Sequence, residues 1–272
     1  MSSMLKRKGA QVLVGVALVT SALVGPSPAS AVIRGLSFYT IVDGPSWTQA
    51  EANAVILGGH LVAINDAGEN QWIKEQFESK LKKYVNGSPS EGLWIGINNA
   101  NNPGVYEWTS GELVTYTDWN IDEPNNAEEP GGTYQRYGII KWQGSDQSYI
   151  DWGDYWNTQQ SWSSTLVPLG IAEISINFSA SQSASPIEGS GLFTTSLFFS
   201  AGIGSNLVNG ETIYWELDGI SADDLASGSM TGFGVVTNGQ LDITHSLLDD
   251  GLDDIENFIV TAYSDPILRT PD

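Results

Sequence analysis

Two short stretches of the sequence carry side-chain oxygens at a spacing that suits cation binding. The first runs Glu123-Pro124-Asn125, and the second places Asn157 after an aromatic pair. One carboxylate and two amide oxygens are the ligand types that a hard cation such as Ca²⁺ takes in proteins. The proline favours a bent loop. A cation held there would bind the hydroxyl groups of a ligand in turn.

The elements that must position these oxygens belong to an α+β domain over residues 34–176. Ser46 with Gln49 predicts one helix start by the capping-box pattern, and Asp66 with Glu69 predicts a second. Short apolar segments predict the strands of this domain, at 36–42, 93–97, 139–142 and 170–174.

Composition sets limits on the partners and chemistry of the protein. The 272-residue chain has 11 basic and 32 acidic residues, for a net charge of −21. That charge disfavours nucleic acid and anionic membranes as partners and attracts cations. The chain has no cysteine, which excludes thiolate zinc sites and cysteine nucleophiles. Stability must come from a hydrophobic core, from bound metal, or from both.

The N-terminus has the pattern of a secretory signal peptide over residues 1–31. Basic Lys6-Arg7-Lys8 precedes an apolar run from Ala10 to Val24, and Ala29-Ser30-Ala31 offers a small-x-small cleavage site. The alternative is an uncleaved anchor, although the run is short for a bilayer span. We therefore expect a secreted or cell-surface protein with no membrane insertion after cleavage.

A change in composition near residue 177 predicts a second domain. Nine of the ten Trp precede this point, whereas one basic residue and fourteen acids follow it. The small polar segment 177–186 is typical of a linker. Beyond it, alternation at 241–247 and β-rich runs at 213–217 and 258–263 predict strands. We expect an all-β sandwich over residues 187–272.

The order of motifs in the first domain resembles the C-type lectin-like domain. The resemblance covers nearly all of 36–176 and rests on Ser46-Trp47, Leu57-Gly58-Gly59-His60-Leu61, Trp94-Ile95-Gly96-Ile97, Trp119-Asn120, Glu123-Pro124-Asn125, Trp156-Asn157 and Gly170-Ile171-Ala172-Glu173-Ile174. It implies a shared calcium and sugar site that keeps Glu123, Asn125 and Asn157. Gln135 and Thr158 depart from the acidic residues of the family pattern. The alternative is that Glu-Pro-Asn survives only as a loop-shaping element.

The second domain resembles a Calx-beta module over about 180–266. The resemblance implies acidic calcium ligands at Glu188, Asp224, Asp250, Asp253 and Glu256. Carboxylates crowded in this way repel one another unless a cation lies between them. The alternative is a solvated acidic loop tip. Calcium is therefore expected in this domain more than in the first.

Three tryptophans in a polar segment have two interpretations. Trp152, Trp156 and Trp162 could stack on the apolar face of a sugar, or they could cap the core beneath a loop.

The sequence thus favours a secreted carbohydrate-binding protein that is not an enzyme, with an acidic β-module as a spacer or adhesive unit. The alternative is an extracellular structural or adhesion protein that binds protein partners through a lectin-like fold, without sugar or calcium in that domain. Neither histidine lies in a catalytic motif, and no nucleophile elbow or phosphate loop occurs.

Overall fold

The computed structural model describes residues 31–81, 92–129, 132–143, 149–157, 169–182, 191–202, 205–249 and 259–263. The described residues fall into two compact units. The N-terminal unit contains residues 37–175, and the C-terminal unit contains residues 33–36 and those from 176 onward.

The described elements are two α-helices, three short 3₁₀ segments and fifteen strands. The helical elements are α1 (Trp47–Ile56), α2 (Ala67–Phe77), η1 (Glu78–Lys80), η2 (Ser205–Val208) and η3 (Ala222–Asp224). The strands are β1 (Ala31–Arg34), β2 (Ser37–Asp43), β3 (His60–Leu61), β4 (Leu93–Asn98), β5 (Glu107–Trp108), β6 (Glu128–Glu129), β7 (Thr133–Tyr134), β8 (Tyr137–Gln143), β9 (Tyr149–Tyr155), β10 (Leu169–Gln182), β11 (Leu192–Ala201), β12 (Thr212–Asp218), β13 (Thr231–Val235), β14 (Gln240–Ser246) and β15 (Ile259–Tyr263).

A mixed sheet forms the centre of the N-terminal unit, with neighbouring strands in the order β2-β10-β4-β8-β9. The pair β10 and β4 is parallel, and the other neighbours are antiparallel. The short β3 and β5 extend this sheet beside β10 and β4, and β6 pairs with β7 separately. The predicted α+β character and the four predicted strands of this unit are confirmed.

Helix α1 begins where the capping pattern predicted. The Ser46 hydroxyl accepts a hydrogen bond from the backbone N–H of Gln49 at 3.1 Å. Ala50 lies against the sheet at Gly170, where an added Cβ would come within 3.1 Å of the Ala50 Cβ. The small residues on both sides therefore let the helix approach the sheet closely.

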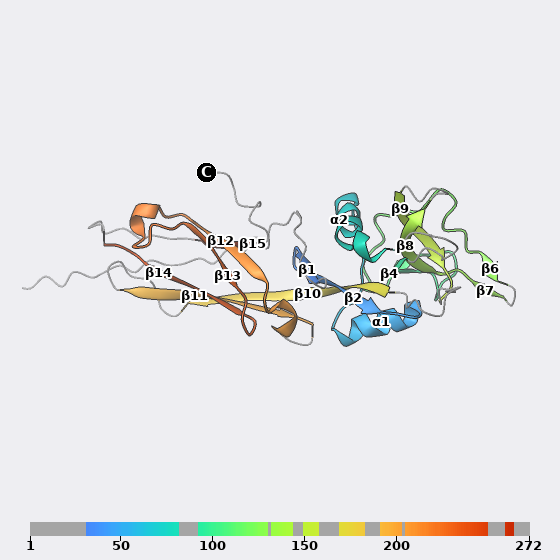
Figure 1. The fold of residues 1–272 in the computed structure, drawn as a ribbon, viewed down its shortest axis with the longest axis horizontal. Helices are drawn as coiled ribbons and strands as arrows, with labels where there is room; N and C mark the ends of the chain where they lie inside the picture. Colours follow the sequence, from blue (N-terminus) through green and yellow to red (C-terminus); the bar gives the residue numbers. More distant parts are fainter. Residues whose placement is uncertain are drawn as a thin grey trace, which may run out of the picture. The chain divides into compact units, whose positions relative to one another are not determined.

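Helix α2 begins with Asp66, whose carboxylate accepts from the backbone N–H of Glu69 at 2.8 Å. The helix packs on β2 through Trp72, whose ring lies 4.9 Å from that of Tyr39 in an edge-on arrangement. The Tyr39 hydroxyl donates to the buried Glu69 at 2.9 Å. Figure 1 shows α1 and α2 on opposite sides of β2 and β10.

The C-terminal unit is built from strands, in two sheets. Residues 176–182 of β10 pair with β11, which pairs with β14, and β13-β12-β15 form the second sheet. The linker predicted over 177–186 is therefore wrong for 177–182, and 183–186 lie outside the described residues. The small polar residues of this segment made its strand pattern hard to see in the sequence. In the strand, the ring of Phe178 packs on that of Phe199, with 5.1 Å between the ring centroids.

His245 lies inside the C-terminal unit between aromatic rings of both sheets. Its ring centroid is 5.5 Å from those of Phe193 and Trp215. Burial lowers the pKa of His245 to about 4. Because the unfolded chain takes up this proton near pH 6.5 and the folded unit does so only near pH 4, the stability of the unit falls as the pH drops through that window.

We predict that His245→Phe removes this contribution while keeping an aromatic ring in place. Urea unfolding at pH 7 and at pH 4.5 should show a smaller acid-induced loss of stability in the variant than in the parent chain. An equal acid-induced loss of stability in the variant and the parent chain would contradict the assignment of this pH dependence to His245.

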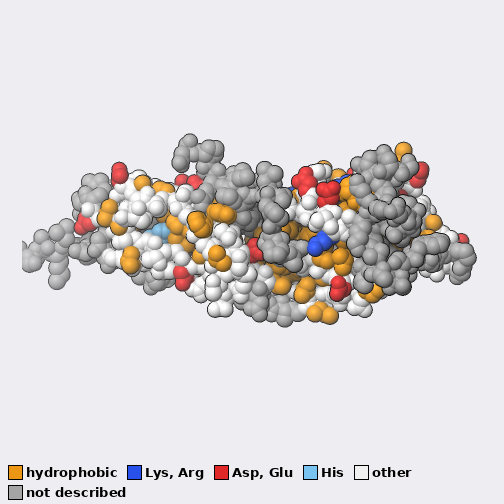
Figure 2. Space-filling model, viewed as in Figure 1, with side chains coloured by type: hydrophobic (Ala, Val, Ile, Leu, Met, Phe, Trp, Pro, Cys, Tyr) orange, Lys and Arg blue, Asp and Glu red, His pale blue; other side chains and the backbone are white. Residues whose placement is uncertain are grey.

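The described surface carries few basic side chains. On the face drawn in Figure 2, acidic groups lie scattered among apolar and neutral ones, and basic groups are rarer. Among the described helices, none is both long enough and apolar enough to cross a membrane.

Candidate functional site

The segment that contains Glu-Pro-Asn is attached by its backbone to β9. The Asn120 N–H donates to the Trp152 carbonyl at 2.9 Å, and the Trp152 N–H donates to the Asp118 carbonyl at 3.0 Å. The Glu123 N–H donates back to the Asn120 carbonyl at 2.9 Å, and the peptide bond between Glu123 and Pro124 is cis. The segment is thus an ordered loop, which we call the 120–127 loop.

Asp154, on β9, anchors this loop from inside the unit. Its side chain is 1% exposed. Its carboxylate accepts hydrogen bonds from the backbone N–H groups of Asn125 at 3.1 Å and Asn126 at 2.9 Å, and from the Tyr106 hydroxyl at 3.0 Å. Hydrogen bonds to a buried carboxylate are among the stronger ones in proteins. Burial and the Asp154 charge also raise the pKa of Tyr106, so this phenol stays protonated as a donor.

Glu123 lies against Asp154 and is a weak ligand for a cation as a result. Burial, together with its hydrogen bond to Asp154 and the charge of Asp154, raises the pKa of Glu123 from 4.5 to about 7. The neutral form of this carboxyl is therefore favoured more than that of an ordinary glutamate, and a neutral carboxyl is a poor ligand for a cation. Lys141, on β8, interacts with both acids. Its burial lowers its pKa, while the two negative charges oppose that effect.

The two amide ligands predicted from the sequence have other partners. The Asn125 Oδ1 accepts from the Ala127 N–H at 2.8 Å within the loop. The Asn157 Oδ1 accepts from the Thr48 N–H at 3.1 Å, and its Nδ2 donates to the Thr48 hydroxyl at 3.2 Å. Of the three predicted ligands, Glu123 and Asn125 thus both contact Asp154. Asn157 instead contacts Thr48, in the first turn of α1. Thr158 lies outside the described residues.

Two buried amide oxygens next to the loop accept no hydrogen bond from any described residue. Gln135 is 7% exposed, its N–H donates to the Ala127 carbonyl at 2.9 Å, and its Oε1 is unpartnered. Asn99 is fully buried, its Nδ2 donates to the Asn126 Oδ1 at 2.7 Å, and its Oδ1 is unpartnered. Asn99 was not singled out from the sequence, and its position directly after the buried strand β4 was the available signal.

These groups do not make a calcium site in the arrangement described. Calcium takes about six to eight oxygens with carboxylates among them. Here Glu123 is bound to another acid, Asn125 and Asn157 accept from backbone N–H groups, and the two unpartnered oxygens are neutral amides. Within the described ranges no three acidic or histidine side chains are placed to hold a metal ion.

Of the three predicted stacking tryptophans, one is buried, one is partly exposed and one lies outside the described residues. Trp152 is 0% exposed, with the rings of Trp108, Tyr116 and Trp119 each 5.8 Å away. The sugar-stacking prediction for Trp152 is therefore wrong, because β9 directs it into the core. Trp156 is partly exposed and packs edge-on against its neighbour Tyr155 at 5.2 Å, and Trp162 lies outside the described residues.

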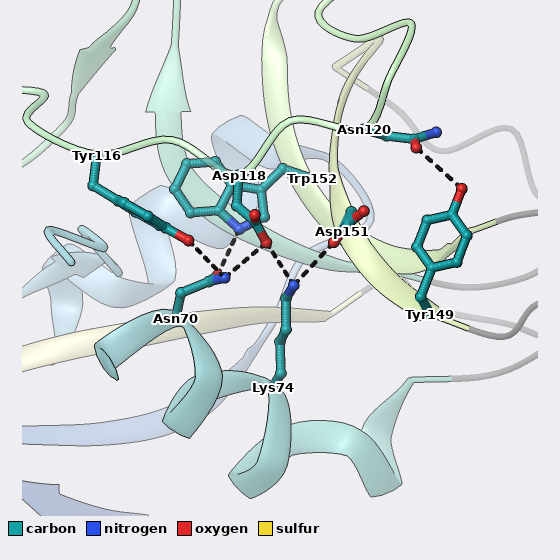
Figure 3. A network of polar contacts seen from close by, with 8 residues as sticks. All are labelled: Asn70, Lys74, Tyr116, Asp118, Asn120, Tyr149, Asp151 and Trp152. Atoms are coloured by element: carbon teal, nitrogen blue, oxygen red, sulfur yellow. Dashed lines mark hydrogen bonds and ion pairs between the residues drawn. The ribbon is translucent and has the colours of Figure 1, made fainter. Parts of the chain in front are cut away.

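A polar network joins α2 to β9 around the buried indole of Trp152 (Figure 3). The indole N–H donates to the Asn70 Oδ1 at 2.9 Å. Lys74 forms ion pairs with Asp118 at 2.6 Å and with Asp151 at 3.0 Å. Burial raises the pKa of Asp151, whereas the hydrogen bonds from Lys74 and Asn70 outweigh burial and lower the pKa of Asp118.

In the C-terminal unit only one predicted calcium ligand is described. The Asp224 carboxylate accepts from the Ser221 N–H at 2.6 Å and closes a capping box on η3. Glu188, Asp250, Asp253 and Glu256 lie outside the described residues. The structure therefore gives Asp224 a local capping role and leaves the other four as predictions.

Known proteins are similar to part of this chain. The chain is 33% identical over 92 residues to a perlucin-like protein of Mytilus galloprovincialis, which covers 33% of this chain and 54% of that protein. It is 31% identical over 99 residues to an alpha-N-acetylgalactosamine-specific lectin of Patiria pectinifera, which covers 36% of this chain and 49% of that protein. The chain thus spans about half the length of these curated relatives.

Among solved structures, the carbohydrate-recognition domain of the human scavenger receptor C-type lectin aligns with a TM-score of 0.42 at 21% identity, over 56% of this chain and 99% of that one. The sequence model of the family described as "Lectin C-type domain" matches residues 44–151. Members of this family are generally binding proteins and not enzymes. Residues 44–151 thus match the C-type lectin domain family.

Proposed function

We propose that the protein is an extracellular carbohydrate-binding protein that recognises sugar through its C-type lectin domain. The observation that carries this proposal is the family match over residues 44–151. A relative at 31% identity is named as a lectin specific for alpha-N-acetylgalactosamine, which makes N-acetylated hexosamines the first sugars to test.

The 120–127 loop is the primary candidate for sugar contact in this proposal, and we infer that it works without calcium. Asp154 supplies the anchor that positions Asn125 and Asn126, and Lys141 supplies positive charge beside the two acids. Because the loop already has an internal carboxylate as its acceptor, its shape does not depend on an added cation.

A glycan array probed with the purified chain, once in calcium and once in chelator, tests both the sugar binding and its independence of calcium. The proposal predicts binding to a subset of glycans that survives the chelator. Binding that disappears with the chelator would overturn the calcium-free site and return calcium to this domain. Silence across a broad array would overturn the lectin function itself.

The alternative function is adhesion through protein partners, without sugar in this domain. Two large exposed aliphatic side chains of the N-terminal unit favour it, since Leu113 is 81% exposed and Ile121, in the loop, is 90% exposed. Array silence combined with loss of partner binding in Ile121→Ser would support this alternative.

For the C-terminal unit we propose an acidic, Calx-beta-like spacer that binds calcium through Glu188, Asp224, Asp250, Asp253 and Glu256. The composition of this segment supports the proposal, with fourteen acids against one basic residue. Calorimetric titration of the chain with calcium should give saturable heat that Asp250→Asn with Asp253→Asn abolishes. Absence of saturable heat in the parent chain would overturn the proposal.

A further inference from the structure

A cleft between α2 and the end of the β8–β9 hairpin has no assigned role. It has a volume of about 350 Å³. Side chains of α2, including Gln71, Lys74 and Glu75, form one wall, and Trp142, Tyr149 and Asp151 form the other. Small-molecule sites fall in the range of about 300–1,000 Å³, so the space suits a ligand of one or two sugar rings.

Hydrogen bonds hold both walls of the cleft in place. Lys74 bridges Asp118 and Asp151 at 2.6 and 3.0 Å and so joins the helix to β9. The Tyr149 hydroxyl donates to the Asn120 Oδ1 at 3.2 Å, which fixes the ring at the outer end, as Figure 3 shows. A preformed cleft binds its ligand without first ordering its own side chains.

The lining combines aromatic rings with polar groups. Trp142 is partly exposed and Tyr149 is 41% exposed, so each offers ring surface to a ligand. Around them stand the Gln71 amide and the carboxylates of Glu75 and Asp151. A sugar ring presents an apolar C–H face that packs on an aromatic ring, while its hydroxyl groups donate to carboxylates and amides.

The charge of the lining limits which sugars fit. Three carboxylates, on Glu75, Glu78 and Asp151, stand against the single ammonium of Lys74, which is already paired. An acidic sugar, a phosphate or a sulfate would be repelled. An apolar ligand would remove water from these carboxylates, whose contacts with Lys74 and Gln71 replace part of their hydration.

We propose that the cleft between α2 and the β8–β9 hairpin is a second carbohydrate subsite that takes a sugar unit without acidic groups, packed on Trp142 and Tyr149. This inference rests on the proposed lectin function and adds a site beside the 120–127 loop, whose Asn120 accepts the hydrogen bond from Tyr149.

Nuclear magnetic resonance titration of the full chain, with galactose, mannose, N-acetylgalactosamine and galacturonic acid as probes, tests the inference. A neutral sugar should shift the amide resonances of Lys74, Tyr149 and Asp151. Tyr149→Ala should weaken its binding about fivefold or more, the loss expected for one aromatic contact. Phe233→Ala, which truncates an aromatic side chain that is 72% exposed in the C-terminal unit, is the matched control and should leave the affinity at the cleft unchanged.

Galactose and galacturonic acid differ in one carboxylate, so the acid should bind at least about fivefold more weakly. The double variant Glu75→Gln with Glu78→Gln should narrow that difference without truncating an aromatic side chain. Equal binding of both sugars, or an unchanged ratio in this variant, would overturn the proposed role of the cleft charges.

The remaining outcomes separate this inference from the proposed function. Neutral-sugar shifts confined to the 120–127 loop, or a positive glycan array with no response at the cleft, would overturn the second subsite and leave the lectin function standing. Cleft resonances that respond to a lysine-rich peptide and to none of the sugars would overturn the subsite as well. A silent array with no shifts anywhere would overturn both.

Discussion

Replacing Trp152 with alanine should lower the free energy of unfolding of the N-terminal unit by about 3–5 kcal/mol, the range for truncating a fully buried aromatic side chain. The indole is 0% exposed and has three aromatic neighbours at 5.8 Å. Its removal also leaves the Asn70 Oδ1 without the donor that lies 2.9 Å away. Urea unfolding followed by tryptophan fluorescence and circular dichroism measures the loss.

Trp156→Ala is the matched control, since Trp156 follows directly after β9 and is partly exposed. It should cost less than half as much, because truncating an exposed side chain leaves a smaller cavity. Equal losses in the two variants would contradict the placement of Trp152 as the centre of the core, and would reopen its role in sugar stacking.

Replacing Asp154 with alanine should destabilise the 120–127 loop and cost about 2–4 kcal/mol, because each polar group deprived of its partner in a buried site costs about 1–3 kcal/mol. The backbone N–H groups of Asn125 and Asn126 and the Tyr106 hydroxyl would lose their common acceptor. Hydrogen exchange at the backbone amides of Asn125 and Asn126 should become faster at both positions together. Asp154→Asn keeps one acceptor oxygen and should retain part of the protection.

The same pair of variants reports on the neighbouring acid. The pKa of Glu123 is raised from 4.5 to about 7, so the folded chain binds more protons than the unfolded chain between these values. Stability from this group is therefore present at low pH and falls as the pH rises through that window. Asp154→Asn should reduce this slope and lower the pKa of Glu123, because it removes the Asp154 charge, while the burial that contributes most to the shift remains. An unchanged slope would contradict the contact between the two acids.

Local patterns in the sequence predicted the frame of the N-terminal unit well. Ser46 and Asp66 begin their helices with the predicted hydrogen bonds, because a cap depends on residues three positions apart. The predicted apolar runs form β4 and β8. Such strands can be predicted locally, because a short apolar run between turn residues is itself the signal of a buried strand.

The site was harder to predict because its contacts are distant in sequence. Asn157 contacts Thr48, 109 positions away in the sequence. The Trp-Asn motif alone therefore could not predict which residue the Asn157 amide would contact. Asp151, Gly153 and Asp154 are residue types depleted in strands and made β9 look like a loop, which concealed the burial of Trp152. The cleft needs α2 and β9 together, and no single segment of the sequence signals it.

The most direct test of the account is a calcium titration of the ¹⁵N-labelled chain, read at the amide resonances of Asn125 and Asn126. Asp154 holds both N–H groups, so the account predicts that neither resonance moves up to about 1 mM calcium, the range in which extracellular calcium modules saturate. Calcium binding by the acidic residues of the C-terminal unit would shift other resonances and would leave the result at Asn125 and Asn126 unchanged. Saturable shifts of Asn125 and Asn126 below that concentration would show that calcium shapes the loop, and would contradict a sugar site held together by Asp154.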